Sequence, residues 1–144
     1  MSGIVCAIRG GPMSQSTIDR SILLAKETGQ TITFIYVVNL DFLTHSSSSR
    51  TEHISSEMRE MGEFILLDAQ EKAHKQGVKA EGIVRDGNVI EQIISYCEEA
   101  QPDFIILGQP ETSRENNLLS GDRMQEVIQR IKDAVDVEVI VSTP

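Results

Sequence analysis

Five short apolar runs, separated by longer segments with helical spacing, constrain the fold of this chain more than any other feature. Three of the runs are largely apolar: Ile4 to Ile8, Ile32 to Val38 and Phe104 to Leu107. Such runs are typical of strands that are covered on both faces, as they are in a parallel sheet. Val78 to Val84 interleaves apolar and charged residues, which favours an edge strand with one solvated face. Val137 to Val141 completes a predicted five-stranded, largely parallel sheet.

The segments between these runs repeat apolar residues every three or four positions, as amphipathic helices do. In the first, Ser16 and Asp19 fit a capping box, and Gly29 fits a C-terminal stop. The second should end at Gly77, and we expect its methionines to fill the core. Asn88 is the expected N-cap of the third. The apolar positions of the four helices are, in chain order, Ile18, Ile22 and Ala25; Ile54, Met58, Met61, Ile65, Ala69 and Ala73; Ile90, Ile93, Ile94 and Cys97; and Met124, Val127, Ile128, Ile131 and Val135.

Strand and helix thus alternate along the chain. Right-handed crossovers between parallel strands place the connecting helices on both faces of one sheet. The length of 144 residues is that of one domain, and a domain of this size buries roughly two-thirds of its unfolded surface. We therefore predict a single α/β domain over residues 1–144.

Residues 40–53 do not follow this alternation. The segment is polar, has no apolar period and contains four consecutive serines, Ser46 to Ser49. Such composition predicts a flexible, disordered loop. A lid or a phosphorylation target is the alternative interpretation, because long loops in compact domains are either functional or disordered.

The charge of the chain excludes two classes of partner. With 13 basic and 22 acidic residues, the net charge is −9, which on average repels a nucleic-acid backbone or an anionic membrane. Cys6 and Cys97 have no short spacing, so we expect two buried, reduced thiols. The N-terminus lacks a basic leader, and no apolar run approaches the roughly 18 residues of a membrane span. These features together predict a cytoplasmic protein.

Two glycine-bearing segments compete for the place where such sheets bind ligands. In doubly wound sheets this place lies beyond the carboxyl ends of the strands, where the strand order reverses. Residues 9–12, which include Arg9 and Gly10, follow the first strand, and Gly108 to Gly121 follow the fourth. If these strands are neighbours, both segments face one crevice.

Gly121 follows Gly108 by thirteen positions and opens a helix, and this spacing resembles the phosphate loop of the universal stress protein family. That loop reads glycine, two residues, glycine, nine residues, glycine and serine or threonine. The first strand, the Tyr36 to Val38 end of the second strand and Gly87 to Leu107 are also similar to that family. The resemblance implies a Rossmann-like domain of the adenine nucleotide alpha hydrolase-like type, with five parallel strands in the order 3-2-1-4-5. It places the nucleotide pocket at Arg9, Gly10, Val37, Val38, Gly108, Glu111, Gly121, Asp122 and Arg123.

The chain departs from the pattern of the family's ATP-binding branch at the residues that would contact the nucleotide. That branch carries an aspartate where this chain has Arg9. Glu111 replaces the second loop glycine, and Pro110 beside it has no N–H to donate. Asp122 stands where the family places a phosphate-binding hydroxyl. Like charges about 4 Å apart near a surface repel by roughly 4 kcal/mol, so two carboxylates would offset much of the affinity for a triphosphate.

We therefore predict a degenerate pocket in the branch of the family that does not bind ATP, with no bound cofactor. A pocket that binds ATP or AMP through rearranged contacts is the alternative. Arg9 is either a solvated side chain or a contact for an anionic ligand. Glu111 and Asp122 are better explained by helix capping at Asp122 than by a metal pair, and the three histidines lack metal-ligand spacing. No catalytic group of nucleophile, base and orienting residue is evident, so we expect no enzyme.

The last predicted strand, Val137 to Val141, would form a sheet edge with little charge to protect it. Members of the family typically dimerise through this strand, so the resemblance implies a homodimer interface at Val137, Val139 and Val141. Coverage of the edge by a neighbouring loop is the alternative. The resulting expectation is a homodimeric, non-catalytic stress-response protein that acts by binding another protein or a small molecule.

Overall fold

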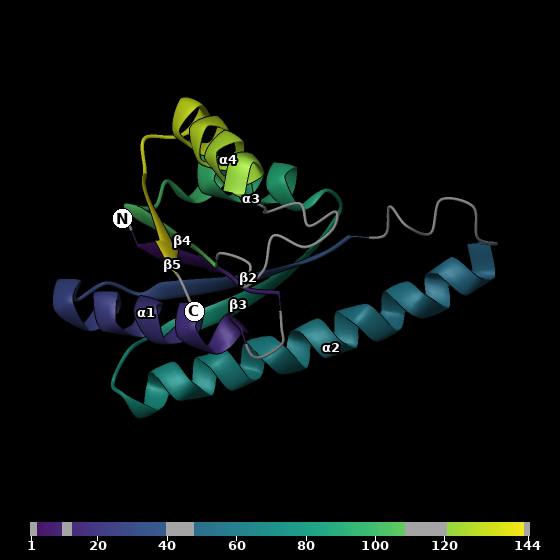
Figure 1. Cartoon of the computed structure of the whole chain (residues 1–144). Helices are drawn as coiled ribbons and strands as arrows, with labels where there is room; N and C mark the ends of the chain where they lie inside the picture. The colour runs from purple at the N-terminus through teal and green to yellow at the C-terminus, as the bar shows by residue number, and fades with distance from the viewer. Residues whose placement is uncertain (1–2, 10–12, 40–47, 109–120, 143–144) are drawn as a thin grey trace.

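The computed structural model describes residues 3–9, 13–39, 48–108 and 121–142. Strands and helices alternate through these residues (Figure 1). The elements are β1 Ile4–Ala7, α1 Met13–Thr28, β2 Ile32–Val38, α2 Ser48–Lys75, β3 Ala80–Asp86, α3 Val89–Ala100, β4 Phe104–Gly108, α4 Gly121–Ala134 and β5 Glu138–Ser142. The predicted alternation of five strands and four helices is confirmed.

The strands form one five-stranded sheet in the order β3-β2-β1-β4-β5. All four neighbouring pairs are parallel, with Ile4 of β1 paired to Ile32 of β2 and to Phe104 of β4. Both the strand order and the parallel pairing were predicted. The prediction that the third strand lies at an edge is also correct, and β5 forms the other edge within the described sheet.

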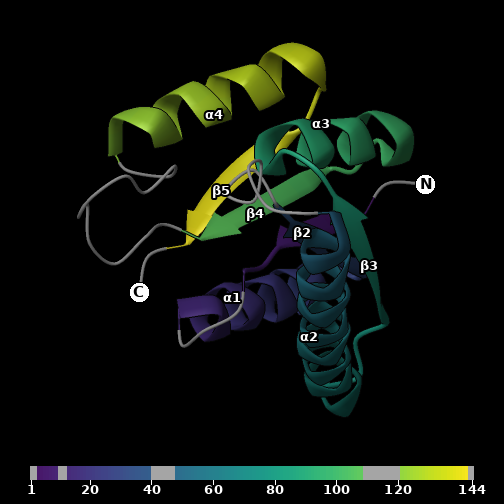
Figure 2. The same cartoon turned by 90° about the vertical axis from the view of Figure 1, so that its right-hand side faces the viewer.

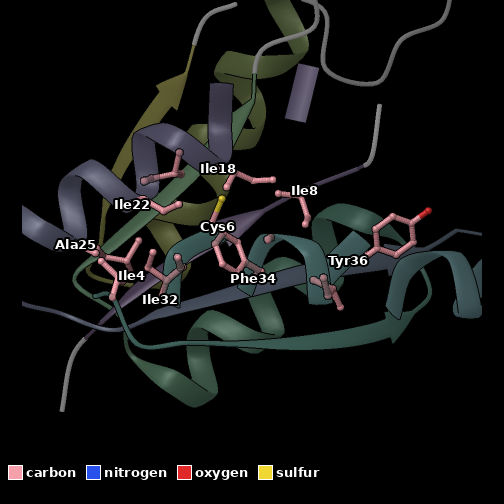
Figure 3. Close-up of a cluster of buried hydrophobic side chains, with 14 of the residues drawn as sticks. Ile4, Cys6, Ile8, Ile18, Ile22, Ala25, Ile32, Phe34 and Tyr36 are labelled. Carbon is pink, nitrogen blue, oxygen red and sulfur yellow. The ribbon is translucent and has the colours of Figure 1, made fainter. Parts of the chain in front are cut away.

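Two helices cover each face of the sheet. Figures 1 and 2 show α1 and α2 on one face and α3 and α4 on the other. Successive strand residues alternate between two cores: Phe34 packs in the core beneath α1 and α2, and Ile35 packs in the core beneath α3 and α4. Figure 3 shows Ile18 and Ile22 of α1 beside Cys6 and Phe34 of the sheet. This alternation explains why the strands read as nearly continuous apolar runs.

Three predicted helix ends agree with the backbone geometry. Gly29 has a φ of 71° and donates its N–H to the carbonyl of Ala25 at 2.8 Å, and Gly77 has a φ of 79°. Both glycines adopt the left-handed conformation that ends a helix. Asn88 caps α3, because its side-chain oxygen accepts the N–H of Glu91 at 3.1 Å.

The predicted start of α1 at Ser16 is wrong, because the helix already begins at Met13. Ser14 and Thr17 are buried in the first turns, at 7% and 2% exposure. Packing of this turn against the sheet therefore sets where the helix begins, and the capping box does not.

Two predictions for the region around α2 are also wrong. The helix begins at Ser48, so the second part of the predicted loop, through His53, is helical, while residues 40–47 lie outside the described residues. Met58 packs against the core as expected, but Met61 is 60% exposed. The next residue, Gly62, faces the sheet instead, where an added Cβ would lie 2.5 Å from the Tyr36 ring. This close approach of helix to sheet rotates Met61 outward.

Candidate functional site

The candidate site is a cavity of about 270 Å³ at the carboxyl ends of β1 and β4. These two strands are neighbours, and the chain leaves β1 towards β2 on one side and β4 towards β5 on the other. The cavity therefore lies at the point where the strand order reverses, where ligands bind in doubly wound sheets. Its lining consists of Ala7, Ile8, Arg9, Ser14, Thr17, Ile35, Val37, Val89, Ile90, Ile93, Leu107, Gly108 and Val127.

Most of the wall is apolar because it is built from core positions. Ile35 and Leu107 point from the strands towards α3 and α4, where Ile93 and Val127 meet them in one buried cluster. The cavity is the open end of that core. A ligand inside it would contact aliphatic side chains over most of its surface.

The polar lining comes from the start of α1 and the end of β1. Ser14 and Thr17 contribute hydroxyl groups, and Arg9 is the only charged residue among the described lining residues. Ile8, just before Arg9, is held by its N–H, which donates to the carbonyl of Ile35 at 3.0 Å. Arg9 thus follows a fixed strand end.

Arg9 is exposed overall, yet partial burial of its guanidinium lowers its pKa below the ordinary value for arginine. A guanidinium keeps its proton in proteins at neutral pH, so the group carries a full positive charge at the cavity. An anionic or electron-rich ligand group would be favoured beside it.

Gly108 lies against α1 at the end of β4. A Cβ added there would come within 2.7 Å of the Thr17 hydroxyl oxygen, closer than carbon and oxygen atoms pack. The glycine therefore allows α1 to approach the strand end, whatever the cavity holds. This local requirement is separate from any phosphate contact.

The structure brings together three of the predicted site residues and separates others. Arg9, just after β1, lines the cavity together with Val37 of β2 and Gly108 of β4. Val38 does not, because its side chain is fully buried in the core beneath α1 and α2. Gly121 is the first residue of α4, as predicted, and Asp122 and Arg123 follow it there, with side chains outside the described part of the structure. Gly10 and Glu111 also lie outside the described residues.

The helical walls of the cavity were missed at the sequence level. Ile90 and Ile93 are predicted only as the apolar face of a core helix, Val89 is not among the predicted positions, and Ser14 precedes the predicted start of α1. The available signal was the position of Ser14 and Thr17 at the start of the helix that follows the first strand. Buried hydroxyls at the start of a helix that follows such a strand are candidates for ligand contact.

Reactive groups are few in the part of the chain that the structure describes. Among these residues no group of three or more His, Cys, Asp or Glu side chains is arranged to hold a metal ion. Cys6 and Cys97 are buried, free thiols, as predicted, and burial raises the pKa of each to about 12. Both thiols therefore stay protonated and unreactive at neutral pH.

The three residues predicted to form an interface at β5 differ in how far their side chains are exposed. Val139 and Val141 are partly exposed, whereas Val137 precedes the strand and is 9% exposed within the core beneath α3 and α4. Val139 and Val141 are thus the better placed for contact with another chain. No helix in the described part of the chain has the length and hydropathy that crossing a bilayer requires.

The strand order and the cavity at its reversal define a doubly wound α/β domain of the Rossmann-like class, which binds ligands at that point. The model of the universal stress protein family matches residues 1–137, and the chain belongs to this family.

The relatives agree with this assignment. The universal stress protein YxiE of Bacillus subtilis (strain 168) is 29% identical over 134 residues, covering 88% of this chain and 90% of that protein. The structure of UspA from Lactobacillus plantarum has a TM-score of 0.80 at 15% identity and covers 98% of this chain and 97% of its own. A family member from Arabidopsis thaliana, solved with AMP bound, has a TM-score of 0.63 at 13% identity, with 99% and 92% covered. At these identities the two solved structures establish the fold alone.

Proposed function

We propose that this chain is a non-catalytic regulatory member of the universal stress protein family, which forms a homodimer and does not bind ATP. The observation that carries this proposal is the chemistry of the cavity, whose described lining is aliphatic apart from two hydroxyls and one arginine. The protein would act by binding a small molecule or another protein.

The size of the cavity supports this proposal. At about 270 Å³ it lies just below the roughly 300–1,000 Å³ of typical small-molecule pockets. Such a volume is sufficient for a ligand of nucleoside size or smaller. The chain adds Glu111 and Asp122 where the family pattern places a phosphate-binding glycine and hydroxyl. Their negative charges would oppose the binding of three phosphates.

Calorimetric titration of the purified protein with ATP and Mg²⁺ should show no binding. The physical reason is that the described lining, which is mostly aliphatic, offers few hydrogen-bond donors to phosphate oxygens, while the two carboxylates would repel them. A dissociation constant in the low micromolar range would exclude the non-ATP branch.

The same samples serve to test the absence of catalysis. Phosphate release from ATP should stay at the level of the buffer blank. If the protein does hydrolyse ATP and the Arg9→Ala variant does not, the chain is an enzyme. Such an outcome is possible because the fold alone does not determine function.

A nucleotide-binding regulator is the second candidate, and the AMP-bound neighbour from Arabidopsis thaliana favours it. In this case the backbone at Val37 or Val38 would meet the base, and Arg9 would face the single phosphate. Mass spectrometry of gently denatured protein would then reveal a carried nucleotide. The double variant Glu111→Gly with Asp122→Ser should also gain affinity for ATP, and no gain would count against a nucleotide pocket of any kind.

A further inference from the structure

Three large apolar side chains lie exposed in a row on α2. Met61 is 60% exposed, Phe64 73% and Leu67 64%. Their spacing of three residues places them on neighbouring turns of one helix face. We call these three residues the α2 stripe. It occupies the face opposite the buried positions Gly62, Leu66, Ala69 and Ala73.

The α2 stripe contributes little to the fold of its own chain. In the described residues the fourth exposed large apolar side chain is Leu23, which stands alone on α1. A single exposed leucine is ordinary, but adjacent exposed apolar side chains mark interaction surfaces. Phe64 is the most exposed of the four and lies at the centre of the row.

Carboxylates surround the α2 stripe. Glu57, Glu60, Glu63, Asp68 and Glu71 are all exposed on the same helix. Cationic side chains described on this helix are engaged in ion pairs: Arg59 pairs with Asp86, and Lys72 pairs with Asp19 at 2.7 Å. Lys75, further along, pairs with Glu71 at 3.3 Å. Glu57 likewise lies 3.1 Å from His53, so Glu60, Glu63 and Asp68 are the described carboxylates that give the apolar centre its negative border.

This charge pattern distinguishes between the molecules that could cover the α2 stripe. If a second copy packed its α2 antiparallel about Phe64, Glu60 of each copy would face Asp68 of the other. Like charges placed together across an interface oppose association. An anionic lipid surface would be repelled by the same carboxylates and by the net charge of −9.

We propose that the α2 stripe is the docking surface for a basic amphipathic helix of a partner protein. The apolar face of such a helix would cover Met61, Phe64 and Leu67, and its flanking lysines and arginines would meet the carboxylates. The α2 stripe shares no residue with the described lining of the cavity. The proposal gives a partner class to the protein-binding part of the proposed function. Its failure would leave the ATP and dimer tests unaffected.

The probe for this proposal is a synthetic, fluorescently labelled helix of leucine and lysine, about five turns long, with all leucines on one face. Fluorescence anisotropy with the full chain should show binding. Phe64→Ser should weaken it at least about tenfold, because a central aromatic residue carries much of the affinity of such contacts. Leu67→Ser should also weaken it, whereas the same substitution at Leu23 on α1 is the matched control and should change the affinity by less than about twofold.

A second peptide of identical composition, scrambled so that it has no apolar face, separates docking from general charge attraction. The scrambled peptide should bind at least about tenfold more weakly than the amphipathic one. Glu60→Gln with Glu63→Gln should weaken binding of the amphipathic peptide and reduce its dependence on salt. Equal binding of both peptides, or equal loss in the Leu23 and Leu67 variants, would overturn the proposal.

Three measurements on the Phe64→Ser variant test whether something other than a partner helix covers the α2 stripe. Sedimentation velocity should show the same assembly as the wild type, and a loss of assembly would assign the stripe to a second copy. Vesicles of phosphatidylcholine should bind neither protein, and binding lost on substitution would assign it to a lipid surface. The thermal midpoint should not fall, and a clear fall would mean that the chain covers the stripe itself. Each of these contrary results would overturn the proposal.

Discussion

Val139→Lys should convert the proposed dimer into a folded monomer, raising the dissociation constant by at least about 100-fold. Val139 lies in the edge strand β5, where its side chain is only partly buried by the chain itself. A lysine there would place a charge in the contact between two edge strands, and an unpaired buried charge costs several kcal/mol. In the free monomer the long side chain can extend into water, so the fold should persist. Sedimentation velocity over a range of concentrations measures the change.

Val84→Lys provides the matched control on the opposite edge. Val84 is a partly buried valine in β3, the other edge strand of the described sheet. This variant should remain a dimer, and far-UV circular dichroism should show that both variants are folded. A wild-type protein that is already monomeric, or a control variant that dissociates equally, would refute the interface at β5.

Phe34→Ala should lower the free energy of unfolding by about 3–5 kcal/mol. Phe34 is fully buried in β2 at the centre of the core beneath α1 and α2. Removing its ring leaves a cavity between Cys6 of the neighbouring strand and the helices, and this packed interior can collapse only in part. Urea unfolding monitored by circular dichroism measures the loss.

Leu23→Ala is the control for this experiment, since Leu23 is 49% exposed on α1. Its effect should stay within about 0.5 kcal/mol of zero, as surface substitutions usually do. A loss below about 1 kcal/mol for Phe34→Ala would mean that the core around it is not closely packed.

The sheet was predictable because each strand is covered on both faces. Burial of alternate residues by different helix pairs requires apolar side chains at nearly every position, and this requirement is visible in the order of the residues. The edge strand β3 was located less well: Val78 to Val84 was expected and Ala80–Asp86 is observed. Its exposed face weakens the apolar pattern, so the pattern cannot fix its ends.

The start of α2 and the direction of Met61 could not be predicted for a related reason. The polar residues Ser48 to His53 resemble a loop in composition, although they form the first turns of a long helix. Figure 1 shows this end of α2 extending beyond the sheet. Farther along α2, an apolar spacing of three or four residues is compatible with either Met61 or Gly62 on the face that packs against the sheet. The Tyr36 ring leaves room only for the glycine.

The sequence predicted where the candidate site lies, but it did not predict most of the residues that line it. Its position followed from the order of the strands, and Arg9, Val37 and Gly108 do line the cavity. Ile90 and Val127 line it too, from α3 and α4, yet in sequence they are indistinguishable from other core positions. Whether a core residue borders the cavity depends on where the ends of two helices lie relative to one strand. That arrangement exists only in three dimensions.

The contact between Gly108 and Thr17 bears on how nucleotide sites are assigned to related sequences. Because α1 touches the end of β4 at this glycine, selection for packing alone is enough to keep it. A sequence can then lose every group that holds a phosphate and still retain the first glycine of the phosphate loop. Its presence is therefore a marker of the domain's architecture and does not by itself indicate that a nucleotide binds.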